Sequence, residues 1–132
     1  MKLTSATLHA LRGLIHLARH GGKAAVPSNA MPGNAQRRYL LRALKALERA
    51  GVLHSTRGPH GGYRLARPAK AISLLDVIEA VDGPVRGAAP PVAGDGAASL
   101  DRRLQAVCDA AAGTVRDTLR GITVAALARR GR

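Results

Sequence analysis

The sequence predicts a mainly α-helical fold with one small β-hairpin, arranged as a winged helix-turn-helix domain followed by a long C-terminal helix. Three observations lead to this fold class. Only two aromatic residues of the Phe, Tyr and Trp type occur, Tyr39 and Tyr63, so the core must come from Leu, Val, Ile and Ala, which favours helices. A basic helical pattern runs directly into a glycine-rich hairpin pattern. The apolar stripe of the last helical pattern, which begins near Ser99, is too long for a small domain to bury. We expect three parts: 1–83, a loop at 84–98, and 99–132.

The first helix is expected over Leu3 to His20, with Gly21 and Gly22 ending it. Leu8, Leu11, Leu14, Ile15, Leu17 and Ala18 form the apolar side, and His9, His16 and His20 fall with the polar residues. His16 and His20 have the four-residue spacing that can hold a metal ion. No carboxylate or cysteine is near them in the sequence, so a solvated polar face is the better interpretation and we predict no metal site.

Residues 24–35 contain two prolines, a glycine and two asparagines, so any helix there should be short or irregular. A strong helix follows from about Gln36, with Asn34 as a plausible cap and Gly51 at its end. One side is apolar, through Leu40, Leu44 and Leu47. The other side forms a cationic ridge made of Arg38, Arg42, Lys45 and Arg49.

Two short strand patterns, 52–56 and 63–66, flank the glycine bend and predict a β-hairpin. An isolated hairpin is barely stable, so it should lie against the helices. Its glycines allow positive φ and a close backbone approach. A phosphate-binding loop of a nucleotide enzyme is a poor alternative, because the Gly-Lys-Ser/Thr ending and the following helix are missing. A surface turn with incidental arginines remains open, and Tyr63 is expected to pack rather than stack on bases.

The charge of the chain is concentrated in its first half. Residues 1–67 hold 12 Lys or Arg and a single acid, Glu48, in a chain of net charge +13. Such a surface favours a polyanionic partner, and nucleic acid is the leading candidate. The alternative is that the cationic ridge is only a solvated helix face.

The sequence also indicates where the protein works. Charged residues interrupt the N-terminal apolar run too often for a signal peptide or a membrane span. One cysteine suits a reducing compartment, so we expect a cytoplasmic protein without membrane contact.

A short helix is expected near residues 73–82, where Ser73 and Asp76 resemble a capping box. Residues 83–98 have a loop composition, and a long helix begins near Ser99. Pairing with a second copy would cover its stripe, so we expect a homodimer. Cys108 should pack at that interface, with an interchain disulfide or a redox-sensing role as the alternative. The expected dimerisation residues are Leu100, Leu104, Val107, Ala111, Val115 and Leu119.

Three segments resemble the Rrf2-type winged-helix regulators, the family that includes IscR, NsrR and CymR. They are "LTSATLHALRGLIHLA", the run from "YLLRALKALERAGVL" through "STRGPHGGYRLARP" to "ISLLDVIEAVDG", and "LRGITVAALA". The resemblance implies a two-fold dimer with one helix in the major groove and the hairpin near the minor groove or backbone. It implies DNA contacts by Gln36, Arg37, Arg38, Tyr39 and Arg42, and on the wing by Arg57, His60, Gly61 and Gly62.

Two features depart from that family. Many relatives hold an iron–sulfur cluster through three cysteines in the loop before the long helix, but the loop here has none, so no cofactor is expected. The helix that normally braces the recognition helix is replaced by "PSNAMPGNA", which puts DNA affinity in doubt.

We therefore predict that residues 1–83 bind double-stranded DNA, with Lys45 and Arg49 on phosphates and Arg37 or Arg38 reading bases. The protein would be a dimeric regulator of a palindromic operator, and a repressor is expected. Its effector, a small molecule or a protein, is open. No nucleophile has a base partner, so no enzyme is predicted. The alternative is a winged-helix module that binds an enzyme or another regulator instead of DNA.

Overall fold

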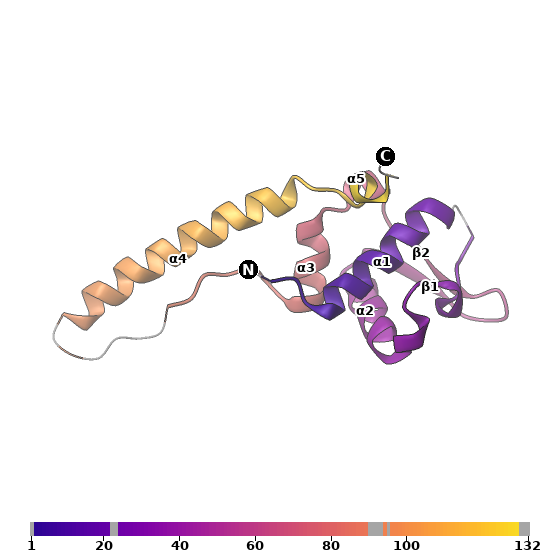
Figure 1. Ribbon diagram of the computed structural model, residues 1–132, viewed down its shortest axis with the longest axis horizontal. Coiled ribbons are helices and arrows are strands. Elements are labelled where there is room, and N and C mark those ends of the chain that lie inside the picture. Colours follow the sequence, from indigo (N-terminus) through magenta and orange to yellow (C-terminus); the bar gives the residue numbers. More distant parts are fainter. Residues whose placement is uncertain (1, 22–23, 90–93, 95, 130–132) are drawn as a thin grey trace.

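The computed structural model describes residues 2–21, 24–89, 94 and 96–129. Helices α1 (Ser5–His20), α2 (Arg37–Arg49) and α3 (Leu74–Asp82) form one end of the molecule together with strands β1 (Leu53–Thr56) and β2 (Gly62–Leu65). Helix α4 (Ala97–Arg120) projects away from this domain, as Figure 1 shows. The mainly helical fold with one antiparallel hairpin confirms the predicted class.

Helix α1 packs through most of the predicted apolar side, with Leu11, Leu14 and Leu17 buried, but two positions differ. Thr4 caps it, accepting a hydrogen bond from the Thr7 amide at 3.1 Å. Leu8 is 53% exposed, whereas His9, assigned to the polar side, is 6% exposed. The prediction was wrong at these two positions because the buried side of α1 is centred on Ala10, Leu14 and Leu17, so it extends toward His9 and away from Leu8.

The segment before α2 is irregular, as predicted. It consists of two single 3₁₀ turns, η1 (Ser28–Ala30) and η2 (Asn34–Gln36), joined through Gly33 at φ 88°. Met31 between them is buried in the core. The N-cap of α2 is Gln36 rather than Asn34, and the Gln36 side chain makes no capping hydrogen bond.

Helix α2 and the hairpin form as expected. Leu40, Leu44 and Leu47 are fully buried, and Gly51 follows the helix at φ 76°. The strands pair with Leu53 opposite Leu65 and Thr56 opposite Gly62. A third segment joins this sheet through Val26, which exchanges two backbone hydrogen bonds with Tyr63, at 2.8 and 2.9 Å.

The chain returns to the domain after α4. The predicted capping box of α3 is present: Ser73 and Asp76 each accept a backbone hydrogen bond from the other. The Leu74 amide donates to the Ile122 carbonyl at 2.7 Å, and the Val124 amide donates to Ile72 at 2.8 Å. These bonds lead into α5 (Val124–Ala128), a short helix that packs on α1. The long helix predicted to begin near Ser99 therefore ends at Arg120, and a separate short helix follows it.

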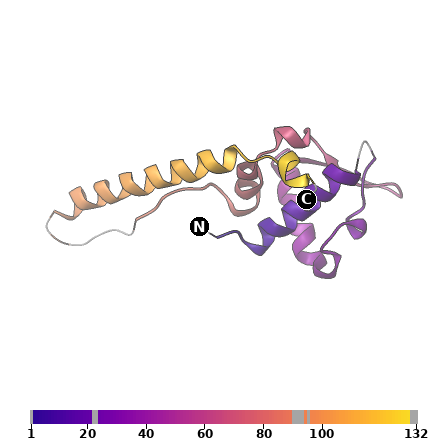
Figure 2. The same cartoon turned by 45° about the horizontal axis from the view of Figure 1, so that its top comes forward.

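Side-chain bonds hold α4 to the rest of the chain. Arg116 of α4 donates to Glu79 of α3 at 3.1 Å, and the same Glu79 oxygen accepts the Val85 amide at 3.0 Å. Farther along α4, Gln105 donates to the Gly87 carbonyl at 2.9 Å. The loop after α3 thus runs beside α4, as Figure 2 shows from a second side. Across the residues described, none of the helices has the length and apolar character to cross a membrane.

Candidate nucleic-acid interface

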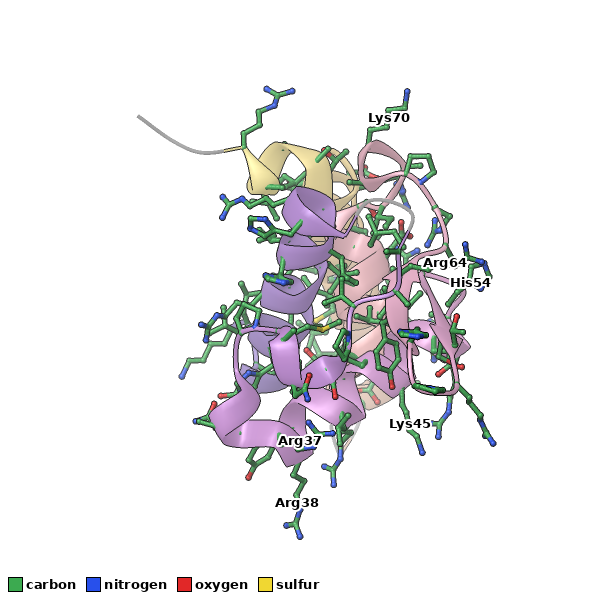
Figure 3. All side chains as sticks on the ribbon, turned by 90° about the vertical axis from the view of Figure 1, so that its right-hand side faces the viewer. Arg37, Arg38, Lys45, His54, Arg64 and Lys70 are labelled. Atoms are coloured by element: carbon green, nitrogen blue, oxygen red, sulfur yellow. The ribbon has the colours of Figure 1, made fainter. Side chains whose placement is uncertain are left out.

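The cationic ridge of α2 is exposed along its whole length. Arg38, Arg42, Lys45 and Arg49 are all exposed, and the ion pairs found among the described residues involve none of them. The apolar side of the same helix is buried, so packing fixes the direction of the ridge. In Figure 3, Arg38 points away from the domain and Lys45 emerges on the wing side of the helix. The helix therefore presents positive charge on a rigid face.

The first turn of α2 carries the remaining residues expected at the groove. Gln36, Arg37 and Tyr39 are exposed, with Tyr39 at 52%. The Tyr39 ring stacks on the buried His9 ring, with centroids 6.3 Å apart and planes 8° from parallel. Sequence reasoning missed this contact because His9 was placed on the polar side. A stacked tyrosine that is half exposed is held in position while its hydroxyl end stays available to a partner.

The wing adds a second basic surface beside the helix. Arg57 and His60, both predicted, are exposed at the bend. The structure adds two residues that sequence reasoning left out, His54 and Arg64, which lie opposite each other in the strand register and are both exposed. Figure 3 shows them together on the outer side of the hairpin. The two-residue alternation of the strands is the signal that could have identified them.

A hollow of about 540 Å³ separates the ridge from the wing. Lys45 and Glu48 of α2 line it together with Arg57 of the wing and Ser28 of η1. The Ser55 hydroxyl donates to Glu48 at 2.7 Å, which ties the only acid of α2 to strand β1. The hollow is therefore lined by a cation of α2 and a cation of the wing, and the Ser55–Glu48 hydrogen bond connects the two elements that carry them.

Tyr63 closes the inner wall of the same hollow. Burial and then the charge of Glu48 raise the pKa of Tyr63, while Arg37 acts in the opposite direction. The phenol accordingly stays neutral at physiological pH, and its ring packs against the core, as predicted.

Gly61 and Gly62 are required by the fold of the wing itself. A Cβ at Gly62, where φ is 148°, would collide with the backbone of Val26. A Cβ at Gly61 would collide with the Thr56 carbonyl. The close backbone approach expected from the sequence thus occurs inside the protein, between the wing and Val26.

The outer face of α4 is apolar and uncovered. Leu100, Leu104 and Val107 are 42%, 39% and 65% exposed, and Ala111 is exposed as well. The other two expected dimerisation residues already pack within their own chain: Leu119 is 7% exposed and Val115 lies against the same core. The uncovered face is therefore confined to the outer part of α4.

Cys108 lies half buried on α4, where the Gly87 backbone approaches it closely. It also lines an apolar hollow of about 410 Å³ between α4 and residues 85–88. Within the part of the chain that the structure describes, no three His, Cys, Asp or Glu side chains gather where they could hold a metal ion.

Comparison with known proteins gives consistent matches. Residues 3–130 match the family model Rrf2, described as "Iron-dependent Transcriptional regulator". The chain is 43% identical over 72 residues to the HTH-type transcriptional regulator IscR of Cereibacter sphaeroides, covering 50% of this chain and 46% of that one. It is 37% identical over 83 residues to Protein aau3 of Rhizobium meliloti, covering 62% and 54%. The chain thus spans about half the length of these curated relatives.

Among solved structures, the chain is similar to the oxidized form of Staphylococcus aureus CymR, with a TM-score of 0.69 and 26% identity. That alignment covers 100% of this chain and 99% of the other. The similarity extends over the domain and the long helix alike.

Proposed function

The chain belongs to the Rrf2 family of transcriptional regulators, and from this premise we propose that it binds an operator in duplex DNA as a homodimer and represses transcription there. Members of the family are regulators and not enzymes. A protein that acts on the chromosome in this way works in the cytoplasm. Residues 1–83, with α5 packed on α1, would form the DNA-binding unit.

The observation that carries this proposal is the exposed ridge of α2 beside the exposed wing. An α-helix with its side chains is about 10–12 Å across, so α2 fits into a major groove about 12 Å wide. Arg37 and Arg38, near its N-terminal end, would reach base edges, since an arginine can bond guanine through two atoms. Lys45 and Arg49, farther along, would bind phosphates.

The wing would contact the DNA beside that groove. Arg57 and His60 at the bend, together with His54 and Arg64 on the strands, are exposed and carry no acid among them. They extend the basic surface from α2 onto the hairpin, where Figure 3 shows His54 and Arg64. We assign them to phosphates, where charge matters more than side-chain shape.

We propose that the uncovered face of α4 pairs with its copy. Leu100, Leu104, Val107 and Ala111 lie on one side of the helix, and burying them would remove apolar surface from water. A two-fold dimer would present two α2 helices and recognise a palindrome whose half-sites are separated by about one helical turn or a multiple of it.

We also propose that the protein acts without the iron–sulfur cluster of its relatives. Clusters are held mainly by cysteine thiolates, and this chain has a single cysteine, on α4 rather than in the preceding loop. The donor residues therefore do not fit such a cluster. Iron analysis and the absorption spectrum of the purified protein test this: stoichiometric iron with a brown colour would contradict it.

The experiment that tests the main proposal is a gel-shift titration with the DNA upstream of its own gene. A random duplex of equal length is the control, and light scattering gives the mass of the free protein. We expect light scattering to give the mass of a dimer, and we expect the random duplex not to abolish the gel shift of the upstream DNA. Equal affinity for both duplexes would contradict an operator-specific role.

One observation favours a second candidate, a winged-helix module that binds a protein. The segment that precedes α2 forms two single 3₁₀ turns instead of a regular helix, so this side of α2 has less support. Retention of a partner protein by a chain that binds neither duplex would favour this function.

A further inference from the structure

A second cationic hollow, of about 260 Å³, lies between α1 and α5. Four nitrogen-bearing side chains of α1 line it: Arg12, His16, Arg19 and His20. Ile15, Pro32 and Leu127 provide its apolar walls. No carboxylate is among the described residues that line it. A hollow with several donors and no acid is suited to an anion.

One donor of this hollow, Arg19, is tied to α5, and the two histidine rings lie against each other. The Arg19 Nε group donates to the Ala128 carbonyl at 2.7 Å, which fixes the guanidinium at the seam between α1 and α5. The His16 and His20 rings, one helical turn apart, have centroids 4.9 Å apart. Arg12 lies one turn before His16, so all four side chains share one side of α1.

The two arginines of the hollow, rather than its histidines, favour an anion over a cation, because a lowered pKa leaves the His16 ring mostly neutral at pH 7. Burial and then the neighbouring His20 lower the pKa of His16, and Arg12 and Arg19 add permanent positive charge on the same helix. From α5 and the segment at Pro32, only apolar side chains among the described residues line the hollow, so none of those residues opposes these charges. A metal cation would have to bind beside two guanidinium groups, whereas a dianion would be attracted by them.

We propose that this hollow binds the phosphate group of a small phosphorylated molecule, with Arg12, Arg19, His16 and His20 as donors and Leu127 against the rest of the ligand. Guanidinium groups match phosphate through parallel hydrogen bonds, which favours phosphate over a single-point anion. The molecule would bridge α1 and α5, the helix through which the chain returns from α4.

The position of the hollow separates it from the DNA interface. In Figure 3, α5 lies at the end of the domain opposite Arg38. A duplex on the α2 ridge would therefore not supply this phosphate. The inference goes beyond the proposed function and does not depend on it, because the ligand can bind whether or not α2 contacts DNA.

The test is an NMR titration of the full chain with inorganic phosphate at pH 7, followed on the histidine ring protons. His16 and His20 should shift together and saturate, while His54 and His60, which lie among wing cations, serve as internal controls. Equal shifts at all four residues would mean general screening of a basic surface and would overturn the site.

Two variants sharpen the result. Arg12→Gln should weaken phosphate binding at His16 and His20 by about tenfold, the value of one charge-assisted hydrogen bond. Arg38→Gln, a matched loss of charge on α2, should leave it unchanged. If both variants change phosphate binding at His16 and His20 to the same extent, the assignment of Arg12 as a donor is wrong.

Three further arms distinguish other ligands. Sulfate, which stays doubly charged from pH 5 to 8, should bind more tightly as the pH falls, because protonated imidazoles attract it; weaker binding at low pH would contradict the site. Zinc chloride in phosphate-free buffer should not bind stoichiometrically, and zinc binding that His20→Gln abolishes would overturn the proposal in favour of a metal site. A short duplex should not displace phosphate from His16; displacement would make the ligand nucleic acid.

Discussion

The ring of His9 on α1 lies parallel to the ring of Tyr39 on α2, with centroids 6.3 Å apart. His9 is 6% exposed, and its buried Nδ1 atom has no hydrogen-bond partner among the atoms that the structure describes. Gly33 covers the other side of this nitrogen, since a Cβ there would lie 3.1 Å from it. The orientation of Tyr39 at the proposed DNA surface thus depends on a residue in the core.

Two replacements of His9 should show whether the packing of its ring or its polar nitrogen matters for stability. His9→Ala removes the support of Tyr39 and leaves a cavity, so it should cost about 1–3 kcal/mol of unfolding free energy and weaken operator binding. His9→Phe keeps the stack and removes an unpartnered nitrogen, so stability should be retained or increased. Urea denaturation and a DNA titration on both variants check this. A His9→Phe protein as unstable as His9→Ala would show that the imidazole nitrogen is needed.

Arg38 and Lys45 should differ in what they contribute to binding. Arg38→Ala should cost about 1–3 kcal/mol on the operator and relax the preference at one base position. Lys45→Ala should weaken operator and random DNA alike and reduce the slope of log K against log salt by about 0.9. Fluorescence anisotropy with both duplexes at several salt concentrations measures the two effects. Identical behaviour of the variants on both duplexes would reject the assigned roles.

Gly62 should tolerate no side chain. Gly62→Ala places a methyl group against the Val26 backbone and should detach Val26 from the wing. The control is Gly58→Ala, which also has a positive φ, 108°, but points into open space. Hydrogen exchange of the Tyr63 amide should accelerate far more in the first variant. Equal acceleration would attribute the effect to backbone strain alone.

Val107 should control the oligomeric state. Val107→Glu places a charge in the uncovered face of α4 and should give a monomer with weaker operator binding, because burying an unpaired carboxylate is costly. Arg102→Glu adds the same side chain on the opposite side of α4, where Arg102 is exposed, and should leave the mass unchanged. Light scattering at several concentrations decides between them. A dimeric Val107→Glu protein would show that α4 pairs through another face.

Glu79 should hold the loop after α3 against α4. Glu79→Ala removes the acceptor of both the Val85 amide and Arg116, so it should lower the unfolding free energy by about 1–2 kcal/mol and speed hydrogen exchange at Val85. Asp117→Ala breaks a more exposed pair with Arg120 and should cost about 0–1 kcal/mol. A larger loss from Asp117→Ala would contradict this account of the link between α3 and α4.

The sequence predicted those elements whose local signals agree with their packing. Ser73 and Asp76 form the capping box of α3 through contacts within one turn, which do not depend on where α3 packs. Gly51 follows the end of α2 because the backbone there needs positive φ. The ridge could be predicted because Leu40, Leu44 and Leu47 turn it outward. His54 and Arg64 were missed because the two-residue alternation of the strands was not applied to them, while the register that places them opposite each other comes only from the structure.

The amino-acid order by itself determined the helical periodicities, the hairpin and the concentration of positive charge on one side of α2, because these depend on residues within a few positions of one another. Tertiary structure alone decided that His9 supports Tyr39, that Val26 joins the wing, and that α5 returns to α1. These contacts join residues far apart along the chain. Which of them form depends on how the helices fit together, and no local pattern contains that information.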